Sequence, residues 1–228
     1  MTSKFCLNVA LRDAIIVTVA LVSISSISGY AIYLKAASAF KEEVKSNLSF
    51  FVKGTSGLVD GDLHEKLLVS DDMSSENYNK VKAPLNRILE GFENIDSIYT
   101  LVKKDNKFYF IMNIPGLGQA NNTIPVMTEY KGPTPILDST FATQDVMVEN
   151  ELYSDELGTF LSAYAPIYNS KKEFIGVIGA DLKDNKYYEG IDKVKESLFS
   201  GTLVAMFVSI LSGVGVWFVR NSAIKAVN

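Results

Sequence analysis

Cysteine and histidine, on which most metal sites and many nucleophilic sites depend, are nearly absent from this sequence. Its 228 residues include one cysteine, Cys6, and one histidine, His64. A structural metal site needs several such ligands, and a Cys/His nucleophile pair needs both residues in one place. We therefore expect neither a metal centre nor cysteine-based catalysis, and a fold held together by packing rather than by disulfides.

The motifs of several common enzyme classes are also missing. The sequence contains no G-x-S-x-G, no Walker loop and no G-x-G-x-x-G. The carboxylate pairs Asp60/Asp62 and Asp71/Asp72 are interpreted as solvated turn residues or helix caps. His64 is interpreted as a residue of a helix surface or an interface, with pH sensing as the alternative. We expect that this chain is not an enzyme and holds no cofactor.

Charge is absent from two long apolar runs, Ala14–Leu34 and Leu198–Val219, neither of which contains Asp, Glu, Lys or Arg. A helix needs about 20 such residues to cross the hydrocarbon core of a bilayer. Both runs are therefore predicted to be transmembrane helices. The first could instead be a cleaved signal peptide, since an A-x-A site follows at 37–39, but an h-region normally spans 7–15 residues. A buried helix of a soluble protein is the other alternative.

The flanking charges predict the orientation in the membrane. The tails 1–13 and 220–228 carry four basic residues and one acid, so the positive-inside rule places both in the cytoplasm. The segment 35–197 is then periplasmic or extracellular, and the chain belongs to the inner (plasma) membrane. This segment has 18 basic and 25 acidic residues, a net charge of −7, which argues against nucleic acid as a partner.

Helical patterns lead the outer segment. A helix is predicted from the first span to about Val52, followed by a short helix from Asp60 and a longer one at 76–91 that Ser75 caps and Pro84 kinks or splits. The apolar stripe of the first helix approximates a heptad, which suits packing against a second copy of the chain. Packing on its own domain is the alternative.

Strand patterns follow. Two hairpins are predicted, each around a polar turn, and a loop and a short helix separate them. The last strand leads into an exit helix and then the second span. Together these patterns predict an α+β fold with a PAS-like antiparallel sheet. The predicted strands are 97–102, 108–113, 160–168 and 174–182, the loop is 114–135, the short helix lies within 139–153, and the exit helix is 186–197.

The run GTFLSAYAPIYNSKKEFIGVIGADL, at 158–182, resembles the closing hairpin of Cache (PAS-like) extracytoplasmic sensor domains. SIYTLVKKDNKFYFIMN resembles the first two strands of that sheet, and DGDLHEKL and APLNRIL resemble its leading helices. The resemblance covers about 40–192. It implies a sensor domain between two spans, with a cytoplasmic kinase, cyclase or chemotaxis output. The nine residues 220–228 are expected to be a stub that leads to such a domain, which this sequence lacks.

The resemblance also implies a ligand on the sheet beneath the irregular loop. An aspartate near the end of the last strand often meets the ligand's amine in that family, and Asp181 matches it. Residues two apart on a strand share a face, which groups Tyr109 with Asn113 and Ser162 with Tyr164. In the alternative, the tyrosines are core residues with hydroxyls tied to the loop, and Asp181 caps the exit turn. The predicted ligand-binding residues are Tyr99, Tyr109, Asn113, Ser162, Tyr164 and Asp181.

These residues favour an amine or an amino-acid-like ligand over a dicarboxylate. Aromatic faces and a carboxylate suit a cation. The outer segment has a single arginine, Arg87, in a predicted helix, so no guanidinium clamp for a carboxylate is expected on the sheet. The sequence thus predicts the input region of a membrane receptor that binds a small molecule and acts as a homodimer. The alternative is a two-span interaction subunit that docks a partner protein and binds no small ligand.

Overall fold

A computed structural model describes residues 2–69, 72–116 and 124–227. The chain divides into two compact units. One combines Met1–Phe40 with Glu189–Asn228, and the other is Lys41–Tyr188.

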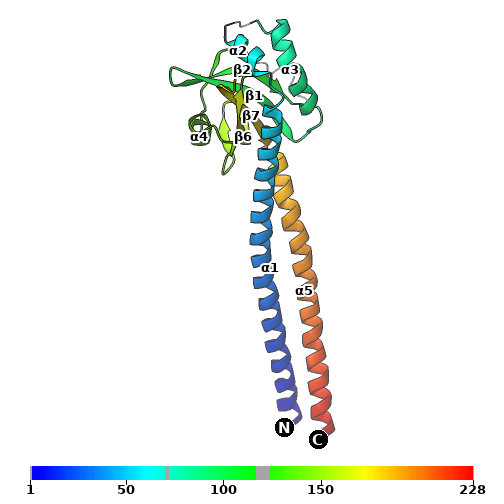
Figure 1. The fold of residues 1–228 in the computed structure, drawn as a ribbon. Helices are drawn as coiled ribbons and strands as arrows, with labels where there is room; N and C mark the ends of the chain where they lie inside the picture. The colour runs from blue at the N-terminus through cyan, green and yellow to red at the C-terminus, as the bar shows by residue number, and fades with distance from the viewer. Residues whose placement is uncertain (1, 70–71, 117–123, 228) are drawn as a thin grey trace. The chain divides into compact units, whose positions relative to one another are not determined.

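The first unit consists of the apolar parts of two long helices, α1 (Thr2–Ser56) and α5 (Asp184–Val227) (Figure 1). Both predicted spans are helical throughout. By length and composition alone, both helices could cross a membrane, a test that a signal sequence or the core helix of a soluble protein can also pass. Within this unit the helices are linked by an ion pair between Asp13 and Arg220 (3.3 Å).

The second unit is built on one antiparallel sheet in the order β3-β2-β1-β7-β6-β4, with β5 also paired to β6. The predicted α+β class with a leading helix and an antiparallel sheet is confirmed. Both predicted hairpins are present, and their strands extend slightly beyond the predicted ends. The strands are β1 (Ile95–Lys104), β2 (Lys107–Pro115), β3 (Thr128–Tyr130), β4 (Met147–Val148), β5 (Tyr153–Asp155), β6 (Gly158–Tyr168) and β7 (Phe174–Lys183).

The β1–β2 turn has the backbone that a tight hairpin requires. Asp105 and Asn106 both have positive φ, at 51° and 60°. Two such residues form a turn whose twist matches that of the flanking strands, and Asn and Asp tolerate this conformation better than other non-glycine residues. The predicted strands left a polar turn at 103–107, and in the structure only two residues, Asp105 and Asn106, lie between β1 and β2.

Helices α2 (Gly61–Lys66) and α3 (Glu76–Leu89) pack against each other, and α3 contacts β1 and β2 on one face of the sheet. His64 of α2 is fully buried there, and its Nε2 lies 2.7 Å from the hydroxyl of Thr100 on β1. The predicted surface or interface position of His64 is therefore wrong, because α2 docks with this side chain inward. Ser75 caps α3 as predicted, and Pro84 does not split it.

Helix α4 (Pro135–Thr143) packs on the other face of the sheet, where it contacts β6 and β7. Its Leu137 is buried in a cluster with Tyr99 and Tyr164. Thr134 caps its start and Gln144, in a left-handed conformation, ends it, so the helix predicted within 139–153 begins earlier. The predicted loop at 114–135 contains β3, while its central part, 117–123, lies outside the described residues.

Three further features lie near the start of the outer segment. In α1, Leu48 and Val52 are buried within the second unit, as expected if this stripe packs on its own domain. The 3-10 helix η1 (Leu67–Val69) extends α2. Of the carboxylate pairs, Asp60 caps α2, whereas Asp71 lies outside the described residues.

Candidate functional site

Asp181 lies at the centre of a buried polar cluster on the face that α4 covers. It is 4% exposed and sits on β7 between Ser97 of β1 and Ser162 of β6. Its carboxylate accepts hydrogen bonds from Tyr99 Oη (2.9 Å), from Ser97 Oγ (3.1 Å) and from Ser162 Oγ. These partners belong to neighbouring strands, so Asp181 is not the cap of the exit turn.

Burial dominates the electrostatics of this carboxyl group. Loss of hydration disfavours the ionised form and raises the pKa of Asp181 to about 7, while the hydroxyls of Ser162, Tyr99 and Ser97 oppose the rise and the charge of Asp155 adds to it. A carboxylic acid with this pKa exchanges its proton near neutral pH.

Tyr99 reaches Asp181 because β7 has a glycine beside it. Gly179 is the cross-strand partner of Tyr99, and the tyrosine ring lies over the position that a side chain at 179 would occupy. The ring packs edge-on against Phe110 with centroids 5.7 Å apart. Burial, and then the charge of Asp181, hold the pKa of Tyr99 well above its usual value, so its hydroxyl stays a donor.

Three further tyrosines extend the cluster away from Asp181. Tyr153 Oη lies 3.1 Å from Ser162 Oγ, 3.4 Å from Tyr164 Oη and 3.3 Å from Tyr130 Oη. Tyr130 in turn donates to Asp155 Oδ2 (3.1 Å). Hydrogen-bonding contacts therefore connect the buried carboxyl group of Asp181 with Asp155 on β5.

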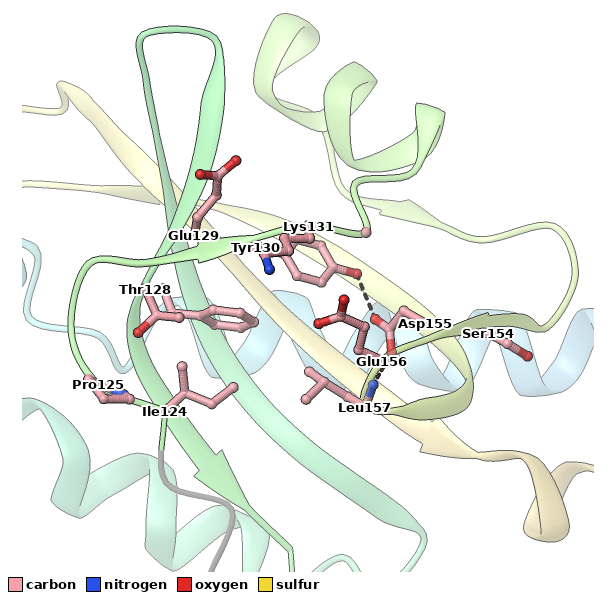
Figure 2. Close-up of a pocket in the computed structure, with 12 residues that line it drawn as sticks. Ile124, Pro125, Thr128, Glu129, Tyr130, Lys131, Ser154, Asp155, Glu156 and Leu157 are labelled. Carbon is pink, nitrogen blue, oxygen red and sulfur yellow. Dashed lines mark hydrogen bonds between the residues drawn. The ribbon is translucent and has the colours of Figure 1, made fainter.

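Asp155 and Tyr130 are part of the wall of a pocket of about 510 Å³ (Figure 2). One side of the pocket is the segment around β3 and the other is the turn that connects β5 with β6. Its lining combines an aromatic and apolar floor with four charged side chains. The lining residues are Phe110, Ile124, Pro125, Thr128, Glu129, Tyr130, Lys131, Gly132, Ser154, Asp155, Glu156 and Leu157.

Five of the six predicted site residues share the face of the sheet that carries Asp181. Asn113, Tyr99 and Tyr164 lie in one row across β2, β1, β7 and β6, because Gly179 is the common partner of both tyrosines. All five residues are buried, and none of them lines the pocket described above. Their role in ligand binding therefore stays a prediction. The hydroxyls of Tyr99 and Tyr164 contact other side chains of the domain.

Tyr109 is the exception. The register of β1 and β2 shifts between Thr100 and Leu101, where an extra residue of β2 interrupts the pairing. Tyr109 pairs with Val102, whereas Asn113 pairs with Tyr99, and these two residues of β1 point to opposite faces. The prediction that Tyr109 and Asn113 share a face is wrong because a bulge reverses the alternation.

Sequence reasoning missed Tyr130, Tyr153 and Asp155. They lie in the three-residue strands β3 and β5, which are too short to show a two-residue period. The available signal was compositional, since tyrosines and carboxylates occur on both sides of the predicted short helix. In the part of the chain that the structure describes, no group of three or more Cys, His, Asp or Glu side chains is placed to hold a metal ion.

Comparisons with known proteins yield structural neighbours only. No protein-family model and no curated protein sequence matches the chain. One similar structure is the ligand-binding domain of the Pseudomonas aeruginosa amino-acid chemoreceptor PctC in complex with GABA, at 16% identity and a TM-score of 0.43, covering 74% of this chain and 68% of that one. Another is the ligand-binding domain of the Campylobacter jejuni chemoreceptor Tlp3 in complex with L-valine, at 15% identity and a TM-score of 0.36, covering 74% and 66%.

A third neighbour is a domain of a Vibrio parahaemolyticus protein ascribed to the sensory box/GGDEF family, at 10% identity and a TM-score of 0.44, covering 71% of this chain and 61% of that one. The chain thus spans between about three fifths and two thirds of the length of these three chains. The first two neighbours are ligand-binding domains of chemoreceptors, as the closing-hairpin resemblance leads us to expect. Because these three TM-scores are below 0.5, the fold assignment rests on the strand order and register of this chain itself.

Proposed function

We propose that this chain is the input region of a transmembrane signal receptor whose segment 35–197 lies outside the membrane and binds a small molecule. The observation that carries this proposal is the pocket of about 510 Å³ beside the cluster around Asp181. A pocket that is partly apolar, with a few converging polar groups and a titratable residue of perturbed pKa nearby, is the usual form of a ligand site.

The ligand that fits this pocket best carries an amine. Three carboxylates, Glu129, Asp155 and Glu156, line it against a single Lys131. Of these, Glu129 is already paired with Lys107 at 2.9 Å. The ring of Tyr130 adds an aromatic face, and contact of a cation with such a face contributes about 0.5–2 kcal/mol depending on desolvation. An amine or amino-acid-like solute is therefore proposed ahead of a dicarboxylate.

The chain connectivity suggests how binding is transmitted. Strand β7, which carries Asp181, ends at Lys183, and α5 begins at the next residue, Asp184. A ligand can shift the receptor only by its differential affinity for two arrangements of the helices. The proposed moving part is α5, in a homodimer that passes the signal to a cytoplasmic output domain. Cysteine crosslinks along 191–198 that do not respond to a bound ligand would contradict this mechanism.

A second candidate function has one observation in its favour. The carboxylate of Asp181 already accepts three hydrogen bonds inside the domain, so the position expected for a ligand's amine is occupied by the protein's own hydroxyls. This arrangement suits a two-span subunit that docks a partner protein and binds no small ligand.

Ligand screening separates the two functions. The full chain in nanodiscs is heated with amines, amino acids, carboxylates and purines, each in large excess. A true ligand raises the melting temperature, because a molecule that binds only the native state stabilises it by RT ln(1 + [L]/Kd). Shifts that stay flat across all four classes favour the interaction subunit.

A further inference from the structure

A line of hydroxyl groups connects the pocket with the buried carboxyl group of β7. From the pocket inward, Asp155 accepts a hydrogen bond from Tyr130, and contacts of 3.3 Å and 3.1 Å then lead through Tyr153 to Ser162, which donates to Asp181. Figure 2 shows the outer end, where the hydroxyl of Tyr130 points to Asp155 at the pocket wall.

The direction of these hydrogen bonds depends on Tyr130. A tyrosine hydroxyl has one proton to donate, and in this structure the proton of Tyr130 is directed to Asp155. If a cationic group in the pocket becomes the donor to Asp155, the hydroxyl of Tyr130 is released and can donate to Tyr153. Tyr153 then donates more strongly to Ser162, and Ser162 to Asp181, because hydrogen bonds in a chain polarise one another.

Asp181 is surrounded by groups that keep their protons. Tyr99 faces it from β1, Tyr130 from β3, Tyr153 from β5 and Tyr164 from β6, and burial raises the pKa of each of these tyrosines. The two other acids near the cluster are Asp155, whose charge raises the pKa of Asp181, and Glu149, which contacts Tyr164 and Thr134. The lysine on the same strand, Lys183, is paired with Asp96 at 3.5 Å.

We propose that the hydroxyl line Tyr130–Tyr153–Ser162 couples the binding of a cation at Asp155 to the release of a proton from Asp181. The proton leaves the carboxyl group of Asp181 and passes to solvent. This inference rests on the proposed function, because it concerns the regulation of the same pocket.

Two effects give the coupling the same sign. The positive charge in the pocket offsets the charge of Asp155, which otherwise disfavours the ionised form of Asp181. The released hydroxyl of Tyr130 strengthens the donors to Asp181 by way of Tyr153. Both effects favour the carboxylate, so cation binding lowers the pKa of Asp181. By linkage, the affinity for the cation rises with pH across the range in which Asp181 titrates.

The first test needs no ligand. The full chain, labelled with ¹³C at the aspartate carboxyl carbon, is titrated by NMR in detergent micelles, and the signal of Asp181 is assigned by its loss in Asp181→Asn. Asp155→Asn removes the charge at the pocket end and retains the oxygen that accepts the N–H groups of Leu157 and Gly158. We expect the Asp181 midpoint to move to lower pH in Asp155→Asn. An unchanged midpoint overturns the coupling.

The second test uses n-butylamine as a cationic probe and n-butanol as its neutral counterpart. The affinity of the wild-type chain for n-butylamine should increase between pH 6 and pH 8. The total increase is about tenfold if binding lowers the pKa of Asp181 by one. The affinity for n-butanol should not change with pH. Tyr130→Phe keeps the ring in the pocket and should lose the part of the pH dependence that the hydroxyls carry, as should Tyr153→Phe, whereas the direct effect of the charge remains. A wild-type pH dependence in both variants overturns the role of the hydroxyl line.

Tyr168→Phe is the matched control, since it removes a hydroxyl from β6 that contacts Gln144 instead of the cluster. It should retain the wild-type pH dependence. Binding of n-butylamine that is independent of pH in the wild type overturns the coupling. If no probe binds but Asp155→Asn still shifts the Asp181 midpoint, the proposed function fails while the electrostatic link between the two carboxyl groups stands.

Discussion

Replacing Gly179 with alanine tests whether Tyr99 must lie across strand β7 to reach Asp181. A side chain at 179 would point into the tyrosine cluster, because Gly179 pairs with Tyr99 on one side and with Tyr164 on the other. A Cβ atom at this position would lie 2.5 Å from Cζ of Tyr99 and 2.9 Å from its Oη. Such contacts are too short for carbon, so the ring of Tyr99 has to move.

The cost of this substitution has two parts. Overpacking a buried site costs about 1–3 kcal/mol, and displacement of Tyr99 breaks its 2.9 Å hydrogen bond to Asp181, which contributes about 1.5–3 kcal/mol when the acceptor is charged. Alanine in a strand regains about 0.5–1 kcal/mol relative to glycine. The expected net loss is about 1.5–5.5 kcal/mol, which lowers the melting temperature by about 3–22 °C for a domain of this size.

Circular dichroism of the full chain in nanodiscs measures this loss, at pH 8 so that Asp181 is ionised. Gly54→Ala in α1 is the control, because an added Cβ there meets no atom within 4 Å and alanine favours a helix by up to about 1 kcal/mol. In a Tyr99→Ala background the clash is gone, and Gly179→Ala should then cost little. A wild-type melting temperature for Gly179→Ala, or the same cost with and without the Tyr99 ring, would refute this reasoning.

Three further predictions concern pH and backbone contacts. Burial lowers the pKa of His64 to about 4 and raises that of Asp181 to about 7. The free energy of unfolding should therefore rise by about 3 kcal/mol between pH 4 and 6.5 because of His64. It should fall by about 4 kcal/mol between pH 4 and 7 because of Asp181. In urea unfolding experiments, the free energy of unfolding of His64→Gln should therefore decrease from pH 4 to pH 7, and that of Asp181→Asn should increase. Equal slopes for the two variants would contradict the assignment. Gly61→Ala should cost about 1–3 kcal/mol in the same assay, because its Cβ would meet the carbonyl oxygen of Tyr168, and a wild-type midpoint would show that α2 can shift freely. Asn106→Val should cost about 1–2 kcal/mol at its positive φ, whereas Asn106→Gly should cost nothing, and equal losses would exclude a turn-specific cause.

Sequence periodicity predicted the hairpins because their strands are long and bounded by polar turns. It also placed Ser162 and Tyr164 on one face correctly, since β6 pairs with β7 in an unbroken register at these positions. The same rule failed for Tyr109 because the pairing of β1 and β2 is interrupted. A bulge changes the face of every residue beyond it, and nothing in the alternation of apolar and polar residues marks its position.

The pocket could not be assembled from the sequence for a different reason. Tyr130 and Tyr153 are separated by 22 intervening residues, and they meet only because β3 pairs with β2 while β5 folds back on β6. Strands of three residues have no detectable period, so their pairing depends on the sheet that has already formed. Long-range pairing of this kind places Asp155 beside Tyr130, and with it the charge that the proposed ligand would meet.

Strand β1 links two buried titratable groups of the domain, His64 and Asp181. Tyr99 and Thr100 are neighbours in the sequence, and because successive side chains of a strand point to opposite faces, Tyr99 donates to Asp181 on one face while Thr100 lies 2.7 Å from His64 on the other. Protonation of His64 would place a charge beneath α2, whereas deprotonation of Asp181 places one beneath α4. Each ionised form is disfavoured by burial, so in the folded domain His64 is neutral and Asp181 is protonated between about pH 4 and pH 7. Over that range the contributions of the two groups to the free energy of unfolding have opposite slopes and largely cancel. A cation in the pocket that promotes the release of the proton from Asp181 would therefore act, by way of Tyr99, on the same strand whose Thr100 contacts His64 of α2.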